Sequence, residues 1–314
     1  MFKKALFLAF SVVLVHPPVG LTCESCMISR IGKDGGARLE SADKKWFAEY
    51  LFEQKNYDRM DAKEAHTLHH QGHDVHDKTT EDFHHLTLGV NVTDDVAMSV
   101  ELPYIIRRFL EVDTHSILGN KQRSEGLGDL TLTTNWRFWT SGAQSLGAVG
   151  GVKFPTGYTG EKNTIGAKFE PEMQPGSGSF DYILGGVYKT QLDRVALTGN
   201  MSYVINTPGA YEFKFGNMLT TSAYLDYALN PAWKEWKTKT GIDLVYQYEQ
   251  KEKQYGNLKA DSGGHRLLTG PSLNVDVWGS SSVYGSLLFP AYQRLGGVHQ
   301  ELDYTWTMGY RLQW

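Results

Sequence analysis

Long apolar runs, cysteine and excess charge are all scarce in this sequence. The mean hydropathy of −0.38 is too low for a protein built from several membrane-spanning helices. The one nearly continuous apolar stretch, residues 5–15, is shorter than the roughly 20 residues that a spanning helix needs. The two cysteines, Cys23 and Cys26, exclude a framework of disulfides. The formal net charge of −4 gives no reason to expect nucleic acid as a partner.

The N-terminus instead has the pattern of a secretory signal peptide. Lys3 and Lys4 precede the apolar stretch, and His16-Pro17-Pro18 ends it. A membrane anchor is the alternative, which the shortness of the apolar stretch disfavours. We therefore expect a signal peptide over 1–22, a periplasmic segment with the cysteine pair over 23–43, and one folded unit over 44–314.

Aromatic residues and glycine are abundant, and apolar residues alternate with polar ones. The clearest case is the C-terminal stretch, in which every second residue is large and apolar: Tyr304, Trp306, Met308, Tyr310, Leu312 and Trp314. A period of two is typical of a strand with one apolar and one polar face. A strand between lipid and a wet lumen has this pattern. The terminal aromatic Trp314 is the expected signal for the barrel assembly machinery.

The same alternation predicts twelve strands in all. Short connections follow every even-numbered strand and longer ones follow the odd-numbered strands, as in outer-membrane barrels. The first range would also suit one face of a helix. We expect an all-β protein, a transmembrane antiparallel up-and-down β-barrel of about 12 strands in a bacterial outer membrane. The expected strands are 44–55, 82–92, 95–107, 127–138, 145–155, 180–190, 194–206, 217–229, 239–250, 265–277, 282–290 and 303–314.

Three stretches resemble a family of outer-membrane proteins named for the meta-pathway of phenol degradation. They are Gly126-Leu127-Gly128-Asp129-Leu130, the stretch Gly151 to Gly157, and the stretch Gln174 to Gly185. The resemblance covers roughly residues 80–314. It implies an outer-membrane barrel that acts as a channel or transporter, and it brings no catalytic residues.

Histidines gather in one predicted external loop. Seven of the 11 lie between residues 66 and 85, five of them in the tight group His66, His69, His70, His73 and His76. Imidazole binds Zn, Cu, Ni and Fe, and short His-rich tracts are candidate metal ligands. The alternative is a solvated polar loop without a specific ligand.

The pair Cys23 and Cys26 allows three interpretations: a soft-metal site, a local disulfide or a redox centre. Met27 follows the pair where a haem-attachment motif needs histidine, so c-type haem is excluded. In the predicted topology the pair is periplasmic and the histidines are external. A metal taken up outside and released inside is therefore an inference from topology alone.

Charged residues on predicted inward faces would line the lumen and tune its selectivity. An equally good alternative is that they pair and fill a narrow interior. The Gly- and Pro-rich loop 156–179 could fold inward as a constriction. The predicted lumen residues are Glu101, Asp129, Arg137, Asp226, Asp243, Glu249, Asp276 and Arg311.

The sequence thus predicts a channel or transporter for a small solute, linked in its sharper form to transition-metal ions. Its expected partners are outer-membrane lipid, the solute or metal ion, and a periplasmic protein bound through 23–43. Two alternatives stay open, a non-conducting scaffold and an outer-membrane enzyme. Catalysis would need a nucleophile near a base, and His115 and Ser116 are adjacent in sequence, which places them on opposite faces of a strand.

Overall fold

The computed structural model describes residues 44–57, 67–68, 76–113, 116–229, 236–277, 280–297 and 300–314. The predicted signal peptide, the segment 23–43 and most of the His-rich loop lie outside these ranges. Those predictions stay untested by the structure.

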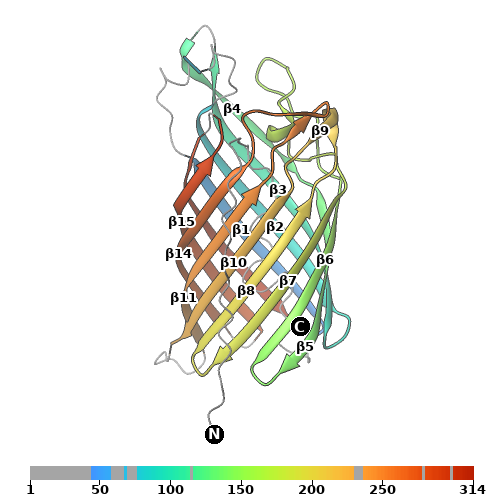
Figure 1. Cartoon of the computed structure of the whole chain (residues 1–314), viewed down its shortest axis with the longest axis vertical. Helices are drawn as coiled ribbons and strands as arrows, with labels where there is room; N and C mark the ends of the chain where they lie inside the picture. The colour runs from blue at the N-terminus through green and yellow to red at the C-terminus, as the bar shows by residue number, and fades with distance from the viewer. Residues whose placement is uncertain are drawn as a thin grey trace.

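Twelve long strands of the described chain close into one antiparallel barrel (Figure 1). Each pairs with its neighbours in sequence, and β1 also pairs with β16. The ring therefore has no open edge, which a sheet in lipid requires because no water is there to satisfy its backbone. The strands are β1 (Trp46–Tyr57), β2 (His76–Asn91), β3 (Val96–Asp113), β5 (Leu130–Ser141), β6 (Gln144–Phe154), β7 (Asp181–Leu192), β8 (Val195–Ile205), β10 (Met218–Ala228), β11 (Lys237–Glu249), β14 (Gly264–Val277), β15 (Ser281–Leu295) and β16 (Leu302–Gln313).

The two ends of the barrel differ. Tight connections such as 142–143 and 193–194 join strands at one end, where β1 begins and β16 ends (Figure 1). The other end carries the long connections, with the 3-10 turns η1 (Pro171–Met173) and η2 (Ala210–Glu212). A small sheet of β9 (Phe213–Lys214), β12 (Lys253–Gln254) and β13 (Asn257–Leu258) lies there too. By the predicted topology this is the extracellular end.

The outer face of the barrel is apolar and its interior is largely polar. Large apolar side chains are exposed on the outside, among them Trp136, Ile242 and Met308. Charged side chains such as Arg107 and Asp181 are completely buried on the inside. This arrangement is the reverse of a water-soluble protein and fits a barrel wall in lipid. Among the described residues no helix is long and apolar enough to cross a bilayer.

Most predicted strand ranges are confirmed, including 44–55, where the structure has a strand and not a helix. One range was wrong. The loop predicted over 108–126 is a hairpin, because β3 continues to Asp113 and pairs with β4 (Ser116–Leu127). Below this hairpin β3 pairs with β5, so β4 and β5 act as one strand interrupted at Gly128 and Asp129. The sequence does not predict this hairpin because Arg108, Lys121 and Arg123 lie on its outer face, so the apolar alternation ends there.

At Gly270, strand β14 lies close to the backbone of strand β15. A Cβ there would contact the backbone carbonyl oxygen of Leu287 and lie 3.1 Å from the Leu288 Cα. Gly270→Ala should therefore destabilise the barrel by about 1–3 kcal/mol, the usual cost of overpacking a close contact. Urea unfolding of the refolded protein, followed by tryptophan fluorescence, measures this. The matched control is Gly199→Ala, whose Cβ meets nothing within 4 Å; equal midpoints for the two variants would contradict the packing described here.

Candidate functional site

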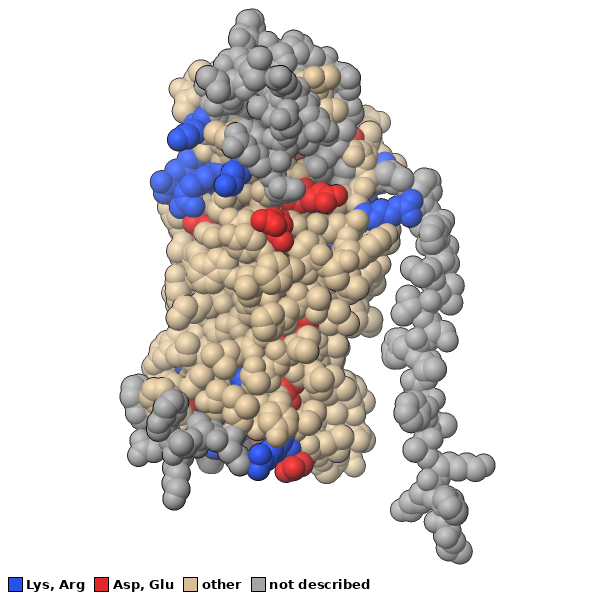
Figure 2. All heavy atoms as spheres, turned by 90° about the vertical axis from the view of Figure 1, so that its left-hand side faces the viewer, with Lys and Arg blue, Asp and Glu red and all other residues tan. Residues whose placement is uncertain are grey.

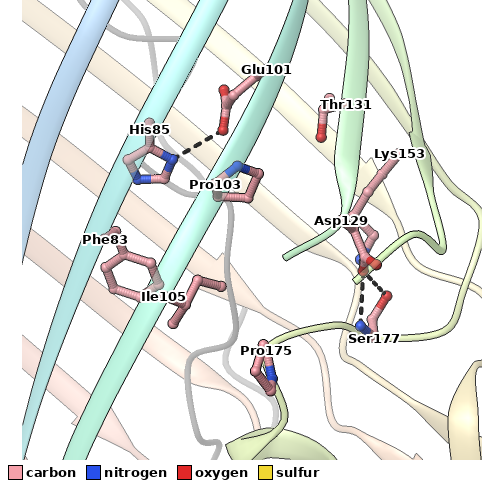
Figure 3. Close-up of a pocket in the computed structure, with 10 residues that line it drawn as sticks. All are labelled: Phe83, His85, Glu101, Pro103, Ile105, Asp129, Thr131, Lys153, Pro175 and Ser177. Carbon is pink, nitrogen blue, oxygen red and sulfur yellow. Dashed lines mark hydrogen bonds and ion pairs between the residues drawn. The ribbon is translucent and has the colours of Figure 1, made fainter. Parts of the chain in front are cut away.

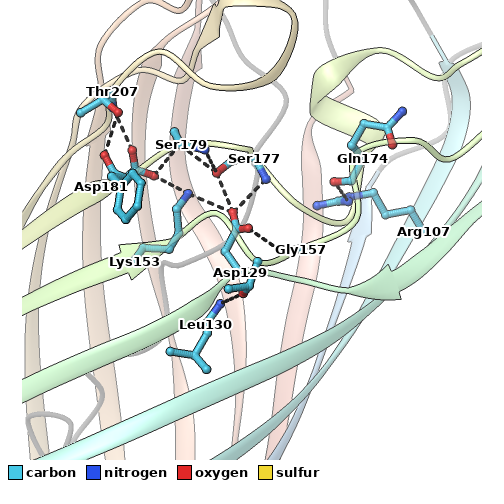
Figure 4. A network of polar contacts seen from close by, with 12 residues as sticks. Arg107, Asp129, Leu130, Lys153, Gly157, Gln174, Ser177, Ser179, Asp181 and Thr207 are labelled. Atoms are coloured by element: carbon cyan, nitrogen blue, oxygen red, sulfur yellow. Dashed lines mark hydrogen bonds and ion pairs between the residues drawn. The ribbon is translucent and has the colours of Figure 1, made fainter.

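The segment 156–179 of the connection between β6 and β7 folds into the extracellular end of the barrel over much of 169–179, while 164–168 is exposed (Figure 4). We call it the inner segment. Its Met173 and Gln174 are almost completely buried. The Ser124 hydroxyl of β4 donates to the Met173 carbonyl oxygen at 2.6 Å, and Phe169 packs edge-on against Phe109 of β3. The Gly- and Pro-rich loop that the sequence singled out thus folds inward.

A buried arginine joins this segment to the wall. Arg107 Nε donates to Glu81 Oε1 at 2.7 Å, and its Nη1 donates to the Gln174 carbonyl oxygen at 3.0 Å. The Tyr57 hydroxyl donates to the other oxygen of the Glu81 carboxylate at 2.9 Å. The guanidinium, the carboxylate and the hydroxyl are all hydrogen-bonded, which offsets the free-energy cost of burying them. The Arg107 guanidinium therefore supports the inner segment at a fixed position.

Asp129 clamps the two ends of the inner segment together (Figure 4). Its Oδ1 accepts the backbone N–H of Gly157 at 2.8 Å. Its Oδ2 accepts the backbone N–H of Ser177 at 2.8 Å and the Ser177 hydroxyl at 2.6 Å. Lys153 Nζ lies 3.6 Å from Oδ2 and also forms an ion pair with Asp181. We call this group of residues the Asp129 clamp.

The same clamp requires glycine at two positions. A Cβ on Gly157 would lie 2.6 Å from the Cα of Gly176 and 2.8 Å from the carbonyl carbon of Gly128. Cβ atoms essentially never come this close to backbone atoms. Only glycine at positions 157 and 176 therefore lets the two ends of the inner segment lie in contact. The three stretches that carry the family resemblance, 126–130, 151–157 and 174–185, therefore come together here. Local patterns gave no sign of this convergence.

A pocket opens on the lumen side of the clamp (Figure 3). His85 of β2 and Glu101 of β3 face each other on one side, with Nδ1 and Oε1 3.1 Å apart. Lys153 and Asp129 stand on the other side. The pocket thus offers donors and acceptors of both charges beside apolar surface. Its lining residues are Phe83, His85, Glu101, Pro103, Ile105, Asp129, Thr131, Lys153, Pro175 and Ser177.

The structure brings only two of the predicted lumen residues, Glu101 and Asp129, into this pocket. Arg137 instead holds the turn between β2 and β3, where its Nε donates to Asp95 Oδ1 at 3.0 Å. The remaining five are spread over other strands and heights. Arg311 donates to Glu49 at 2.7 Å, Asp243 accepts from the Ser272 hydroxyl at 2.7 Å, Asp226 is buried in β10, and Glu249 and Asp276 are half-buried at the ends of β11 and β14.

The predicted metal ligands fall largely outside the described residues. This holds for Cys23, Cys26, His66, His69, His70 and His73, while His76 is described only as the first backbone position of β2. Within the described ranges, no group of three or more His, Cys, Asp or Glu side chains is placed to hold a metal ion. Metal binding therefore stays a prediction. Trp314, the predicted assembly signal, pairs its backbone with Trp46 at 3.0 Å.

Sequence reasoning missed a buried acidic contact between two extracellular connections. Glu172 of the inner segment forms an ion pair with Lys259, and Glu252 Oε2 lies 3.9 Å from the same ammonium group. Glu252 is only 1% exposed, and neither of its carboxylate oxygens has a hydrogen bond. Burial raises the pKa of Glu252 well above its usual value, and the nearby Glu172 and Glu249 raise it further while Lys259 opposes them. The charged form of this carboxyl is therefore disfavoured in the folded protein.

This contact predicts a pH dependence. Because the native pKa of Glu252 exceeds the unfolded one, stability is lost as pH rises from the usual glutamate range through the native pKa. The connection 250–263 should therefore become easier to cleave with rising pH, and Glu252→Gln should flatten that trend. Limited proteolysis of the refolded barrel across pH measures it. The control is the exposed Glu212→Gln; a Glu252→Gln profile that matches this control and the parent would show that Glu252 does not titrate as described.

The family described as "Putative MetA-pathway of phenol degradation" matches residues 70–290. No curated protein matches the chain. An outer membrane channel of Pseudomonas putida F1 has a similar fold, with a TM-score of 0.62 and 16% identity over 86% of this chain and 96% of that one.

A second solved structure is the β domain of the Bordetella autotransporter BrkA. Its TM-score is 0.53 at 10% identity, covering 87% of this chain and all 100% of that one. Both likenesses concern the fold. The family match, which spans well over half of the sequence and includes all three clamp stretches, shows more: the chain is a β-barrel of the bacterial outer membrane and belongs to the family described by the MetA-pathway of phenol degradation.

Proposed function

We propose that the protein is an outer-membrane channel for a small polar solute, and that the inner segment sets the width of its path. The observation that carries this proposal is the Asp129 clamp, which holds the inner segment inside a largely polar barrel. A loop fixed inside a lumen narrows it and decides what passes. The similar structure from Pseudomonas putida F1, described as an outer membrane channel, supports this function.

The pocket beside the clamp indicates what kind of solute suits the path. His85 and Glu101 face Lys153 and Asp129 across it, so both hydrogen-bond donors and acceptors are present. Phe83, Pro103, Ile105 and Pro175 add apolar surface. A small solute with polar groups and an apolar face would gain contacts with both. We propose transport and not catalysis, with the charged residues serving to fix the inner segment and to contact the solute.

Gly157→Ala tests the role of the inner segment. The added Cβ would collide with the backbone at Gly176 and Gly128, which should weaken docking by about 1–3 kcal/mol. We expect a larger and noisier single-channel conductance in a planar bilayer than for the unmodified protein. Gly150→Ala is the matched control, since its Cβ meets nothing within 4 Å.

Two outcomes would count against the proposal. A folded barrel that conducts neither before nor after Gly157→Ala would favour a non-conducting scaffold. Equal conductance of the unmodified protein and a folded Gly157→Ala variant would show that the inner segment does not set the path.

A link to transition metals rests on the histidine spacing alone, and we keep it as a second proposal. Replacing His66, His69, His70, His73 and His76 with Gln removes the candidate imidazole ligands. If metal acts through them, micromolar Zn²⁺ or Cu²⁺ should alter the conductance of the unmodified protein and leave that of the variant unchanged. Conductance indifferent to metal in both would leave a general channel.

A further inference from the structure

The β3–β4 hairpin rises above the apolar belt of the barrel. On its outer face Tyr104 pairs in register with Leu127, and both side chains are exposed where lipid would contact them. Further along the hairpin the paired outward residues are Ile106 with Glu125, then Arg108 with Arg123, then Leu110 with Lys121. Figure 2 shows Lys and Arg side chains on the upper wall, with Asp and Glu side chains at a similar height, above a broad belt that is almost free of charge.

The height of this basic group follows from strand geometry. Arg108 is four residues beyond Tyr104, and Arg123 lies as far from Leu127. A strand that rises about 3.3 Å per residue and tilts by about 40° places them about 10 Å above that pair. Polar headgroups occupy this level, just outside the hydrocarbon core. The guanidinium groups therefore lie where the phosphates of the outer leaflet are found.

Among the described residues, the charges at this level are not balanced. Arg108 and Arg123 stand directly opposite each other, an arrangement of like charges that is unfavourable across two strands. Each has one carboxylate partner: Arg108 Nη1 lies 2.6 Å from Asp82 Oδ2, and Arg123 pairs with Glu125. Asp82 also accepts a hydrogen bond from Gln54, and Lys121 adds a third positive charge. Arg108, Arg123 and Lys121 thus outnumber the two carboxylates described beside them, Asp82 and Glu125.

The two guanidinium groups are also accessible. Their side chains are 47% and 54% exposed, and each ion pair engages one terminal nitrogen of a group that carries five N–H donors. The remaining donors can reach an anion from the membrane side. Arginine binds phosphate through two parallel hydrogen bonds, which suits a pair of guanidinium groups at one height.

We propose that Arg108, Arg123 and Lys121 form a binding site for the phosphate of an outer-leaflet glycolipid headgroup. The bound phosphate relieves the repulsion between the two opposed arginines. It also fixes the position of the hairpin relative to the membrane, since basic groups at this level attract anionic lipid.

The test uses the full chain in nanodiscs of neutral phospholipid, with diphosphoryl lipid A added in the presence of EDTA. Native mass spectrometry counts the lipid A molecules retained by the folded barrel. We expect Arg108→Gln with Arg123→Gln to weaken retention at least about tenfold, the loss that follows from two charge-assisted hydrogen bonds. The control is Arg294→Gln, an exposed arginine on β15 at the same end of the barrel.

Three results would overturn the site. An equal loss in Arg294→Gln would show attraction by general surface charge. Undiminished binding of lipid A without phosphates by the unmodified protein would show that the acyl chains alone are recognised. Displacement of lipid A by inorganic phosphate at equal concentration would show a site for free phosphate and not for lipid. The last two measurements need no variant, so they hold even if the double substitution prevents folding.

Discussion

The inner segment stays in the lumen because one buried carboxylate accepts hydrogen bonds from both of its ends. Asp129 binds the N–H of Gly157 where the segment begins and the N–H of Ser177 where it finishes. A charge buried without partners would be costly, but here three hydrogen bonds and the Lys153 ammonium offset that cost. The segment and the wall thus depend on each other through this one carboxylate.

Local pairing of opposite charges recurs elsewhere in the lumen. Glu81 pairs with Arg107 near the inner segment, and Arg311 pairs with Glu49 close to the opposite end. A ring of unpaired charges of one sign would select strongly by charge. Pairs of opposite sign at separate heights produce a wet interior with a weaker net field. Selection in such a lumen depends more on the width that the inner segment leaves and on the groups beside it.

The sequence predicts the barrel because lipid imposes a pattern that neighbouring residues reveal. Wherever the wall meets lipid, as over 303–314, apolar and polar residues alternate and the strand can be recognised. Where the hairpin leaves the lipid, Arg123 and Lys121 occupy outward positions and the pattern disappears, so the sequence predicts a loop over 108–126. The Asp129 clamp cannot be predicted from local sequence patterns, for a different reason. Asp129 and Ser177 are 48 positions apart, and only the closed barrel brings them together.

The β3–β4 hairpin connects the two sides of the wall, because adjacent residues on a strand point in opposite directions. Arg107 and Ser124 point inward and hold the inner segment, while their neighbours Arg108 and Arg123 point outward to the proposed headgroup. A phosphate bound outside would therefore restrain the same backbone that supports the inner segment. Loosening that contact would let the hairpin tilt, and the supports at Gln174 and Met173 would move with it. If the protein conducts as proposed, its conductance should accordingly respond to the phosphates of the surrounding lipid.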